Sequence, residues 1–333
     1  MFTIGNRKIG KNQPVYIIAE AGINHNGDLN IAKNLIKEAS KCGADAIKFQ
    51  TIITDELFSK KLNPELYELV NQWVLSKKDH LMLMDCAKKN NIQFFSTPMG
   101  ERTTKLLVSL NISAIKIASG DLDYHQFLKS VAKTKTPMIV STGMSKISEI
   151  ASAVEIIKNE NCKLALLHCN SSYPTPIEDA NLSTIPYLQN MFDIPIGYSD
   201  HTDGIDACVA AVVIGATILE KHFTLDKEME GPDQKLSSDP KEFSELVTKV
   251  RLIEKALGSP RSGVTKSEQK FVRKMRKSIG VSVDIPANTS ITKSMLTAFR
   301  PGNGIPPSMM DQLIGLKPKK AIAKDTQLSW DMF

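Results

Sequence analysis

The sequence is poor in the features that mark secreted, membrane-bound or disulfide-bonded proteins. Its five cysteines (42, 86, 162, 169 and 208) are odd in number and lack the paired spacing of a metal site. Such cysteines are typical of reduced thiols in the cytoplasm, although Cys169 could also act as a nucleophile. No apolar run reaches the length of a membrane span, and residues 1–14 lack the apolar core of a signal peptide. We therefore expect a cytoplasmic protein without a membrane partner.

Two further absences narrow the choice of fold and partner. The first apolar run leads into AEAGINHNG, which lacks the G-x-G-x-x-G fingerprint of a dinucleotide-binding sheet. The basic run at 266–277 holds a single aromatic residue, so it is typical of a solvated linker helix and not of a nucleic-acid site. The net charge of +6 is modest and fits an anionic small-molecule substrate. We expect no nucleic-acid partner.

What the sequence does contain is a regular alternation of short apolar runs and amphipathic segments. Eight runs have the two-sided apolar character of buried parallel strands: 15–19, 44–49, 92–96, 114–118, 138–141, 163–169, 194–198 and 217–219. Segments with helical spacing separate them, which predicts an α/β protein with a parallel sheet. Eight strand–helix units predict a closed (β/α)8 barrel, with an open doubly wound sheet as the alternative.

The composition changes after Gly258. Residues 259–274 are polar and basic, whereas 276–333 contain short β-type pieces separated by turn residues. We therefore divide the chain into a barrel catalytic domain (1–260), a linker (261–275) and a small, mainly β domain (276–333). The last part is short for an independently stable core, so we expect it to dock.

Polar residues end nearly every predicted strand, at the end where barrel enzymes carry their active sites. They are Glu20, Lys48, Gln50, Thr97, Lys116, Ser119, Ser141, Thr142, His168, Asn170, Ser199, His201, Glu220 and His222. Any one of them has a simpler explanation, such as a snorkelling lysine or a hydrogen-bonded core histidine. Their shared position predicts an active site at this face.

The lysines and carboxylates among these residues indicate an anion site with acid–base groups. Lys48 and Lys116 lie on strands, so their charges need compensation. Serines and glycines nearby offer hydroxyl and backbone N–H donors, which together with the lysines suit a phosphate or carboxylate. Glu20 and Glu220 are candidate acid–base groups or could orient substrate hydroxyls.

Two histidines end the last two predicted strands. His201 and His222 would lie side by side and offer neutral imidazoles to Mn²⁺, Zn²⁺ or a similar ion. Two histidines are too few for a closed structural site, so substrate and water would complete the coordination shell. Alternatively, they are only hydrogen-bonded to Asp200 and Glu220.

Ordered motifs along the chain resemble those of the sialic acid synthase family, whose members make nonulosonic acids. They are EAGINHNGDL, KFQT, FFSTP, KIASGD, STGM, HCNSSYPTP, GYSDHT, ILEKHFT and GPDQKLS. Near the end, RPGNGIPP resembles the family's C-terminal antifreeze-like (SAF, β-clip) domain. The resemblance therefore covers nearly the whole chain and implies a TIM barrel followed by a SAF domain.

The resemblance implies an N-acetylneuraminate synthase-type transferase. In this family phosphoenolpyruvate condenses with an open-chain N-acyl hexosamine aldehyde, water attacks C2 of the enolpyruvyl group, and phosphate leaves by C–O cleavage. The positions matching His201 and His222 hold a divalent metal, Mn²⁺ first and Mg²⁺ or Co²⁺ as alternatives, which polarises the aldehyde.

The resemblance also implies roles for individual residues. The implied phosphoenolpyruvate ligands are Lys48, Lys116, Ser119, Ser141 and Ser199, with Ser171 in the place of Asn170. The implied sugar contacts are Glu20, which also helps to position water, Gln50 and Tyr173. Glu220 matches a residue beside the metal. Arg300 matches an arginine that reaches from a partner subunit to the N-acyl group, which implies a domain-swapped homodimer.

Departures from the family pattern leave the sugar open. Asp121 stands where the family often has glutamate, and the loop 52–73 lacks the asparagine-bearing segment of neuraminate-making bacterial enzymes. Because that loop borders the sugar, both N-acetylmannosamine and a 2,4-diacetamido-6-deoxy analogue are candidates, with legionaminate or pseudaminate as alternative products.

Two other functions stay open: a lyase with a Schiff base on Lys116, and a non-catalytic carbohydrate-binding protein of surface polysaccharides.

Overall fold

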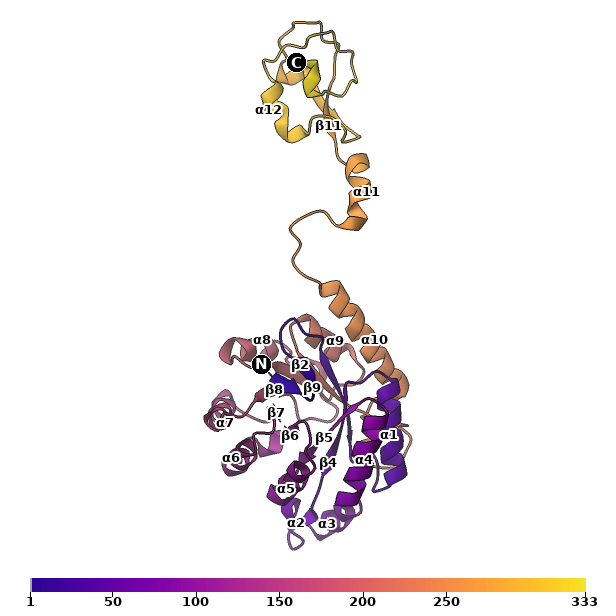
Figure 1. Cartoon of the computed structure of the whole chain (residues 1–333), viewed down its shortest axis with the longest axis vertical. Coiled ribbons are helices and arrows are strands. Elements are labelled where there is room, and N and C mark those ends of the chain that lie inside the picture. Colours follow the sequence, from indigo (N-terminus) through magenta and orange to yellow (C-terminus); the bar gives the residue numbers. More distant parts are fainter. Residues whose placement is uncertain (1) are drawn as a thin grey trace. The chain divides into compact units, whose positions relative to one another are not determined.

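Eight parallel strands close into a barrel in the computed structural model, which describes residues 2–333 (Figure 1). The strands are β3 (Tyr16–Gly22), β4 (Ala46–Thr51), β5 (Gln93–Pro98), β6 (Ile115–Ile117), β7 (Met138–Ser141), β8 (Leu164–Cys169), β9 (Ile196–Asp200) and β10 (Ile218–His222). Each strand pairs with the next one along the chain, and β10 closes the ring against β3. The barrel belongs to the first of two units, Met1–Gly258, and the second is Ser259–Phe333.

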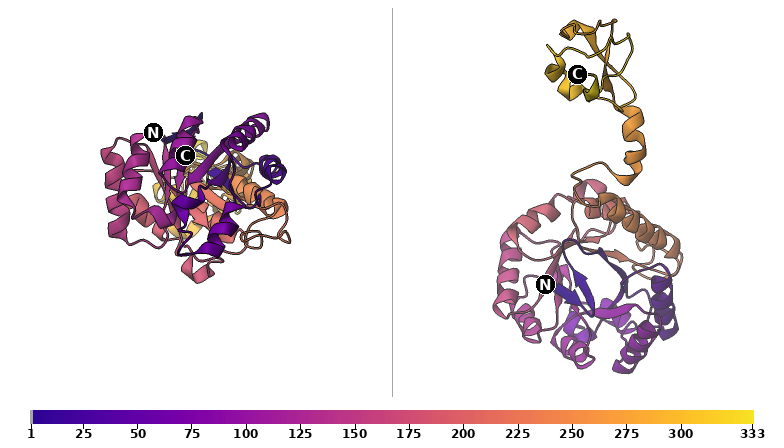
Figure 2. Two further views of the ribbon diagram at one scale, coloured as in Figure 1. Left: turned by 90° about the horizontal axis from the view of Figure 1, so that it is seen from below. Right: turned by 45° about the horizontal axis from the view of Figure 1, so that its top comes forward.

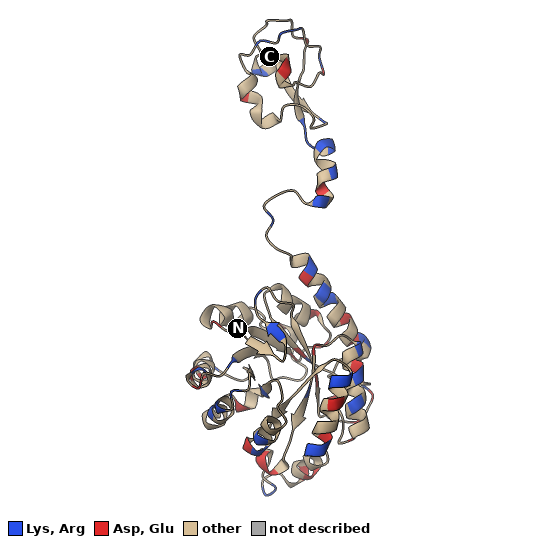
Figure 3. Ribbon diagram, viewed as in Figure 1, with Lys and Arg blue, Asp and Glu red and all other residues tan. Residues whose placement is uncertain are grey.

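Helices form an outer ring around the barrel, as the right-hand view of Figure 2 shows. They are α1 (Leu29–Lys41), α4 (Lys77–Lys89), α5 (Glu101–Ser109), α6 (His125–Lys133), α7 (Ile147–Asn159), α8 (Thr184–Met191), α9 (Asp206–Val213) and α10 (Pro240–Leu257). Charged residues mark the solvent sides of α1, α4 and α10 (Figure 3). No helix of the described residues could span a membrane. The predicted (β/α)8 barrel is confirmed.

Five strands run further than the apolar pattern predicts. The predicted strands stop at residues 19, 49, 96, 198 and 219, whereas β3, β4, β5, β9 and β10 end at Gly22, Thr51, Pro98, Asp200 and His222. The hydrogen-bonded ladder includes the polar residues, since His222 is the register partner of Glu20. Apolar periodicity ends early because inward side chains near the carboxyl end of the barrel are polar.

A short N-terminal hairpin packs under the barrel and was not predicted. Its strands β1 (Phe2–Ile4) and β2 (Arg7–Ile9) pair antiparallel. Phe2, Ile4 and Ile9 join one buried cluster with inward-facing barrel residues, among them Tyr16 and Phe95. Because this apolar cluster fills the interior of the barrel at its amino end, the polar residues inside the barrel lie toward its carboxyl end.

The long segment between β4 and α4 carries two short helices, α2 (Thr54–Leu57) and α3 (Pro64–Asn71). Glu56 ties this segment to the start of α5, where its carboxylate accepts the Arg102 and Thr103 N–H groups at 2.6 and 3.0 Å. Ile23, Ile52 and Val70 form a small buried cluster beneath it. The loop that borders the carboxyl face is therefore held in place both by hydrogen bonds to α5 and by apolar packing.

The second unit has a small core of its own. Helix α11 (Lys266–Met275), which is exposed along most of its length, precedes the antiparallel strands β11 (Ser278–Val281) and β12 (Leu296–Phe299). A short helix, α12 (Met310–Leu313), and several turns follow. Its buried cluster consists of Ile279, Val281, Ile285, Ile291, Leu296, Ile305, Leu313, Ile322 and Leu328. The predicted small, mainly β domain is confirmed, and the predicted linker contains α11.

Candidate active site

Because side chains alternate along each strand, a ring of polar and charged side chains points into the barrel interior. In β10, Ile218 belongs to the interior cluster and Leu219 to the outer one, so Glu220 and His222 point inward. The same alternation in β3, β4 and β6 turns Glu20, Lys48 and Lys116 inward. All five side chains are buried. Local periodicity therefore explains why these residues meet.

The inward charges form a compensated cluster. The Lys48 Nζ lies 2.6 Å from Glu20 Oε2 and 3.7 Å from Glu220 Oε1, and the Lys116 Nζ lies 3.8 Å from the same Glu220 oxygen. Ser199 Oγ donates to Glu220 Oε1 at 3.2 Å. Two ammonium groups thus face two carboxylates, which makes the burial of four charges tolerable.

The two carboxyls differ in their pKa values. Burial raises the pKa of Glu20 to about 7, and Glu220 adds to the rise although Lys48 opposes it. Burial also acts to raise the pKa of Glu220, but Lys116 and Lys48 outweigh it and the pKa is lowered. Burial lowers the pKa of Lys116. Carboxyls with separated pKa values can take different proton-transfer roles, so Glu20 is the one able to carry a proton near neutral pH.

Hydroxyl groups from three strand ends form a cradle beside Lys116. The Lys116 Nζ donates to Ser141 Oγ at 2.6 Å, and the Gly143 N–H donates to Ser119 Oγ at 3.0 Å. A Cβ atom on Gly143 would overlap the Ser171 hydroxyl and lie 2.9 Å from Ser119 Oγ. We call Lys116, Ser119, Ser141, Gly143 and Ser171 the anion cradle. Its ammonium and hydroxyl donors suit a phosphate group.

Asn170 is turned away from this cradle. Its side-chain amide donates to the Asp179 carbonyl at 3.2 Å, and its Oδ1 accepts the Ser172 N–H at 2.9 Å. The Ser171 hydroxyl, by contrast, is the one next to Gly143. The geometry thus favours Ser171 over Asn170 as the residue facing an anion.

His201 and His222 lie together with Tyr173 at the barrel mouth. The two imidazole centroids are 5.4 Å apart, and the Tyr173 ring lies 4.0 Å from that of His201 and 5.9 Å from that of His222. His201 Nδ1 lies 2.6 Å from the Asn170 carbonyl. Since a carbonyl only accepts, Nδ1 carries the proton and Nε2 keeps its lone pair.

These histidines fit a divalent metal. Burial lowers the pKa of both, and His201 adds to the effect at His222, so both are neutral at pH 7. Within residues 2–333, His222 Nδ1 has no hydrogen-bond partner, and neither imidazole bonds to Asp200 or Glu220. The same residues contain no group of three or more His, Cys, Asp or Glu able to hold a metal. Two neutral imidazoles can hold a metal only if other ligands complete its shell.

A carboxylate from the loop after β10, that of Asp233, also lies close to the histidines. Asp233 Oδ2 lies 3.9 Å from His222 Nδ1. A Cβ atom on Gly22 would lie 3.4 Å from Glu20 Oε1, 3.5 Å from Gln50 Nε2 and 3.6 Å from Asp233 Oδ2. Three polar side chains thus surround one glycine, an arrangement suited to several hydroxyl groups. Burial raises the pKa of Asp233.

Known proteins share this architecture over nearly the full chain. Residues 35–262 match the NeuB family and residues 276–333 match the SAF domain. The chain belongs to the NeuB family. It is 38% identical to the N,N′-diacetyllegionaminic acid synthase of Legionella pneumophila, over 98% of each chain. It is 40% identical to the Campylobacter jejuni enzyme of the same name, covering 93% of this chain and 97% of that one.

A solved structure gives the same picture. The N-acetylneuraminic acid synthetase of Leptospira borgpetersenii, in complex with citrate, is 43% identical with a TM-score of 0.77. The match covers 81% of this chain and 94% of that one. The resemblance to sialic acid synthases is confirmed, and this NeuB-family protein belongs to a group of nonulosonic acid synthases.

Asp233 belongs to the candidate site of this NeuB-family protein, but a search for polar residues at the ends of predicted strands did not find it. It lies in a loop and not at a strand end, so apolar periodicity gives no signal for it. The GPDQKLS motif, which contains it, was the available clue. Its neighbourhood is held by Asn24, whose Nδ2 donates to the Phe223 carbonyl and to Ser237 Oγ, both at 2.9 Å.

Of three further predicted candidates, Arg300 and Asp121 lie outside the central cluster and Cys169 lies beside His201. Arg300 belongs to the second unit, where its Nε donates to the Met275 carbonyl at 2.9 Å. Asp121 follows the cradle residue Ser119, and burial raises its pKa. Cys169 Sγ lies 3.8 Å from His201 Nδ1, but burial raises the pKa of this thiol, which does not favour a nucleophilic role.

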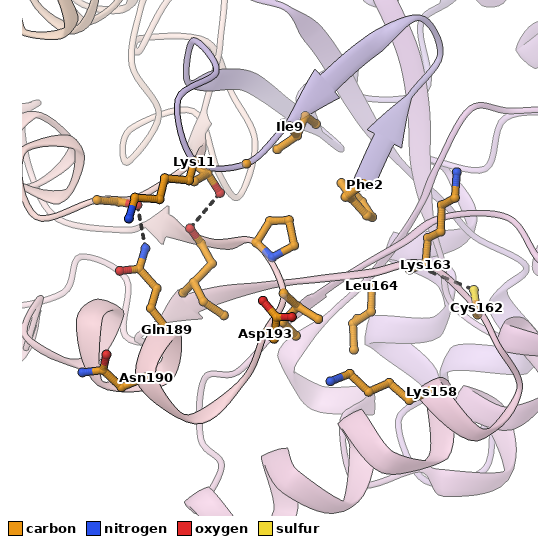
Figure 4. Close-up of a pocket in the computed structure, with 16 residues that line it drawn as sticks. Phe2, Ile9, Lys11, Lys158, Cys162, Lys163, Leu164, Gln189, Asn190 and Asp193 are labelled. Carbon is orange, nitrogen blue, oxygen red and sulfur yellow. Dashed lines mark hydrogen bonds between the residues drawn. The ribbon is translucent and has the colours of Figure 1, made fainter. Parts of the chain in front are cut away.

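A separate cavity of about 740 Å³ opens at the amino end of the barrel (Figure 4). Its lining includes Phe2 and Ile9 of the N-terminal hairpin, with Lys11, Lys158 and Lys163 at its edge. Within residues 2–333, none of the predicted site residues lines it. The volume of a cavity therefore does not identify the candidate site of this NeuB-family protein. The convergence of charged side chains inside the barrel identifies it.

Proposed function

We propose that the protein condenses phosphoenolpyruvate with an open-chain N-acyl hexosamine aldehyde and water to give a nonulosonic acid and phosphate. C3 of the enolpyruvyl group forms the new C–C bond to the aldehyde carbon, water adds to C2, and the C2–O bond to phosphate breaks. One observation carries the proposal: the anion cradle and the neutral histidine pair flank the same buried carboxyls, Glu20 and Glu220.

The anionic half of the site would hold phosphoenolpyruvate. The proposed ligands are Lys48, Lys116, Ser119, Ser141, Ser171 and Ser199. Both ammonium groups are paired with carboxylates. To bind a trianion, at least one ammonium group must therefore be freed from its carboxylate partner. Protonation of Glu20, whose pKa is about 7, releases Lys48 at the least free-energy cost.

The electrophilic half of the site would hold the aldehyde. His201 and His222 would bind a divalent cation, Mn²⁺ first and Mg²⁺ or Co²⁺ as alternatives. When bound, that ion would supply Lewis-acid polarisation of the aldehyde oxygen. Glu20, Gln50, Tyr173 and Asp233 would orient the sugar hydroxyls, and Glu20 would also direct water toward C2. Glu220 would stay ionised beside the ion and compensate its charge.

Arg300 would complete the site from a second copy of the chain. The cluster of sugar-facing groups in the barrel consists of carboxyls, an amide and a phenol. A guanidinium from the SAF domain of a partner would add a donor for the N-acyl carbonyl. We propose a domain-swapped homodimer on this basis.

The sugar is N-acetylmannosamine or a 2,4-diacetamido-6-deoxy analogue, the latter giving legionaminate or pseudaminate. Synthases named for legionaminic and neuraminic acids are 40% and 43% identical to this chain, so similarity favours neither. The loop with α2 and α3 is the part of the barrel expected to select the sugar.

A phosphate-release assay with phosphoenolpyruvate, Mn²⁺ and a panel of N-acyl sugars tests the proposal, with the product mass identifying the sugar. Release is expected only when aminosugar and ion are both present, and His201→Ala should abolish it while the circular dichroism spectrum stays unchanged. Sugar binding without phosphate release from any panel member would instead support a carbohydrate-binding protein.

A second candidate is a pyruvate lyase, because the lowered pKa of Lys116 is a property of Schiff-base lysines. Borohydride trapping with pyruvate distinguishes it. A covalent adduct at Lys116 would reject the condensation mechanism, whereas an unmodified Lys116 would reject the lyase.

A further inference from the structure

A buried ion pair lies directly behind the two histidines. Asp200 and Lys221 precede His201 and His222, and because side chains alternate along a strand, they point to the opposite face. The Lys221 Nζ lies 2.8 Å from Asp200 Oδ2, and the two side chains are 3% and 0% exposed. Outside the barrel, Cys208 of α9 donates to Asp200 Oδ2 at 3.2 Å. The pair is thus sealed between the strands and a helix.

The bonds of this pair hold the backbone on both sides of His201. Asp200 Oδ1 accepts the Thr202 N–H at 2.9 Å, and the Lys221 Nζ donates to the Thr202 carbonyl at 2.6 Å. Lys221 therefore contacts the residue before His201 and the residue after it. Since His222 is the next residue after Lys221, one ammonium group links the backbones that carry both histidines.

The strand ladder does not provide this link by itself. In the described register, β9 and β10 pair as far as Asp200 and Lys221 and no further. Beyond that point His222 pairs with Glu20 of β3, and the His201 carbonyl accepts a bond from the Thr175 N–H at 2.8 Å. The two histidines are thus held by different neighbours, and the ion pair is the cross-link nearest to them.

We propose that Asp200 and Lys221 are positioning residues that set the spacing of His201 and His222 for a divalent ion. The inference rests on the proposed function, in which these histidines hold the ion. A well-packed apolar pair could join two strands without the desolvation penalty of two charges. A charged pair adds bonds of fixed direction, and here these bonds fix the backbone that carries the imidazoles and not the rings themselves.

Removal of Lys221 should therefore weaken metal binding more than it weakens phosphoenolpyruvate binding. Loss of such a supporting partner typically lowers metal affinity by about 10- to 100-fold. The anion cradle lies at the carboxyl ends of β6, β7 and β8 and keeps its own bonds. We expect kcat at subsaturating Mn²⁺ to fall in parallel with Mn²⁺ affinity, while KM for phosphoenolpyruvate at saturating Mn²⁺ changes by less than about threefold.

The experiment measures the Kd of Mn²⁺ for the full-length protein by calorimetry and by electron paramagnetic resonance. The variants are Lys221→Met, the double variant Asp200→Asn/Lys221→Met, which leaves no buried charge unpaired, and Lys221→Arg, which keeps the charge. The matched control is Arg251→Met. It removes two other ion pairs, in which Arg251 Nη2 lies 2.9 Å from Asp45 Oδ2, just before β4, and Arg251 Nη1 lies 3.0 Å from Glu254 Oε1.

The expected result is a Kd raised by about 10- to 100-fold in both Met variants, partial recovery in Lys221→Arg, and a Kd within about twofold of the parent in Arg251→Met. A folded Lys221→Met or double variant with the parental Kd overturns the inference. So does failure of both Met variants to fold, because the pair would then serve stability alone. Absence of Mn²⁺ binding by the parent protein would instead reject the metal role of the histidines.

Discussion

Alanine at Gly143 would place a methyl group inside the anion cradle. Its Cβ would overlap the Ser171 hydroxyl and lie 2.9 Å from Ser119 Oγ. Gly143 does not adopt a positive φ, so the backbone accepts alanine without strain. The clash falls on serine side chains that can rotate away, and the substitution should therefore spare the fold while displacing donors from the phosphate.

The size of the effect follows from the number of donors displaced. A hydrogen bond to a charged group contributes about 1.5–3 kcal/mol. Loss of one such bond from Ser119 or Ser171 lowers kcat/KM for phosphoenolpyruvate by about 10- to 150-fold, since about 1.4 kcal/mol is a factor of ten. The melting temperature should change by only a few degrees, because the backbone entropy gained by alanine partly offsets the local rearrangement.

Gly120→Ala is the matched control. It lies one residue from Ser119, does not adopt a positive φ, and no atom of the described chain lies within 4 Å of an added Cβ. Phosphate release as a function of phosphoenolpyruvate concentration is measured for both variants and the parent. Equal kcat/KM values for Gly143→Ala and Gly120→Ala would refute the assignment of this loop to the phosphate.

Three other predictions concern the sugar, the subunit arrangement and the pH dependence of stability. Asp233→Ala should raise KM for the aminosugar by about 10- to 100-fold with little change in KM for phosphoenolpyruvate, because a lost bond to a charged group contributes about 1.5–3 kcal/mol; equal increases for both substrates would contradict a sugar contact. Mixed Arg300→Ala and His201→Ala chains should regain about a quarter of parental activity, since half of the dimers are mixed and each holds one intact site; an inactive mixture of proven heterodimers would place Arg300 in the site of its own chain. Burial lowers the pKa of His25 to about 4, below its value of about 6.5 in an unfolded chain. The unfolded state then binds more protons as pH falls below about 6.5, so His25 should remove about 2 kcal/mol of stability by pH 5. Urea unfolding of His25→Asn should show a correspondingly flatter pH dependence, and an unchanged slope would exclude His25 as its source.

The barrel could be predicted because the sequence signal for each of its strands and helices lies within that element. Each strand is a short apolar run, and each helix has its own period, so their alternation can be counted along the sequence. Strand alternation also brings Lys48, Lys116 and Glu220 to one interior without knowledge of distant contacts. The same logic failed at strand ends, since inward polar residues such as Glu20 continue the ladder after the apolar pattern stops.

The remaining site residues could not be predicted from periodicity because loops place them. Asp233 reaches His222 through a turn-rich segment, and Ser171 reaches Gly143 from another strand end. Neither contact leaves a repeating pattern in the sequence. The N-terminal hairpin is similar, because its three-residue strands are too short for a periodicity signal. Motif resemblance supplied Ser171, but it did not single out Asp233.

Charge pairing explains why the carboxyl ends of β9 and β10 are so polar. On the inner face Glu220 faces Lys48 and Lys116, and on the outer face Asp200 faces Lys221, so buried charges on both faces are compensated. The two pairings differ in geometry. The outer pair is close at 2.8 Å, whereas the inner contacts of Glu220 are 3.7 and 3.8 Å long. The looser contacts of Glu220 do not hold either ammonium group tightly, so Lys116 can turn toward a bound anion, and Lys48 can do so once it is released from Glu20, whose Oε2 lies 2.6 Å from its Nζ. In the arrangement that we propose, the tight outer pair keeps the histidine backbones fixed meanwhile.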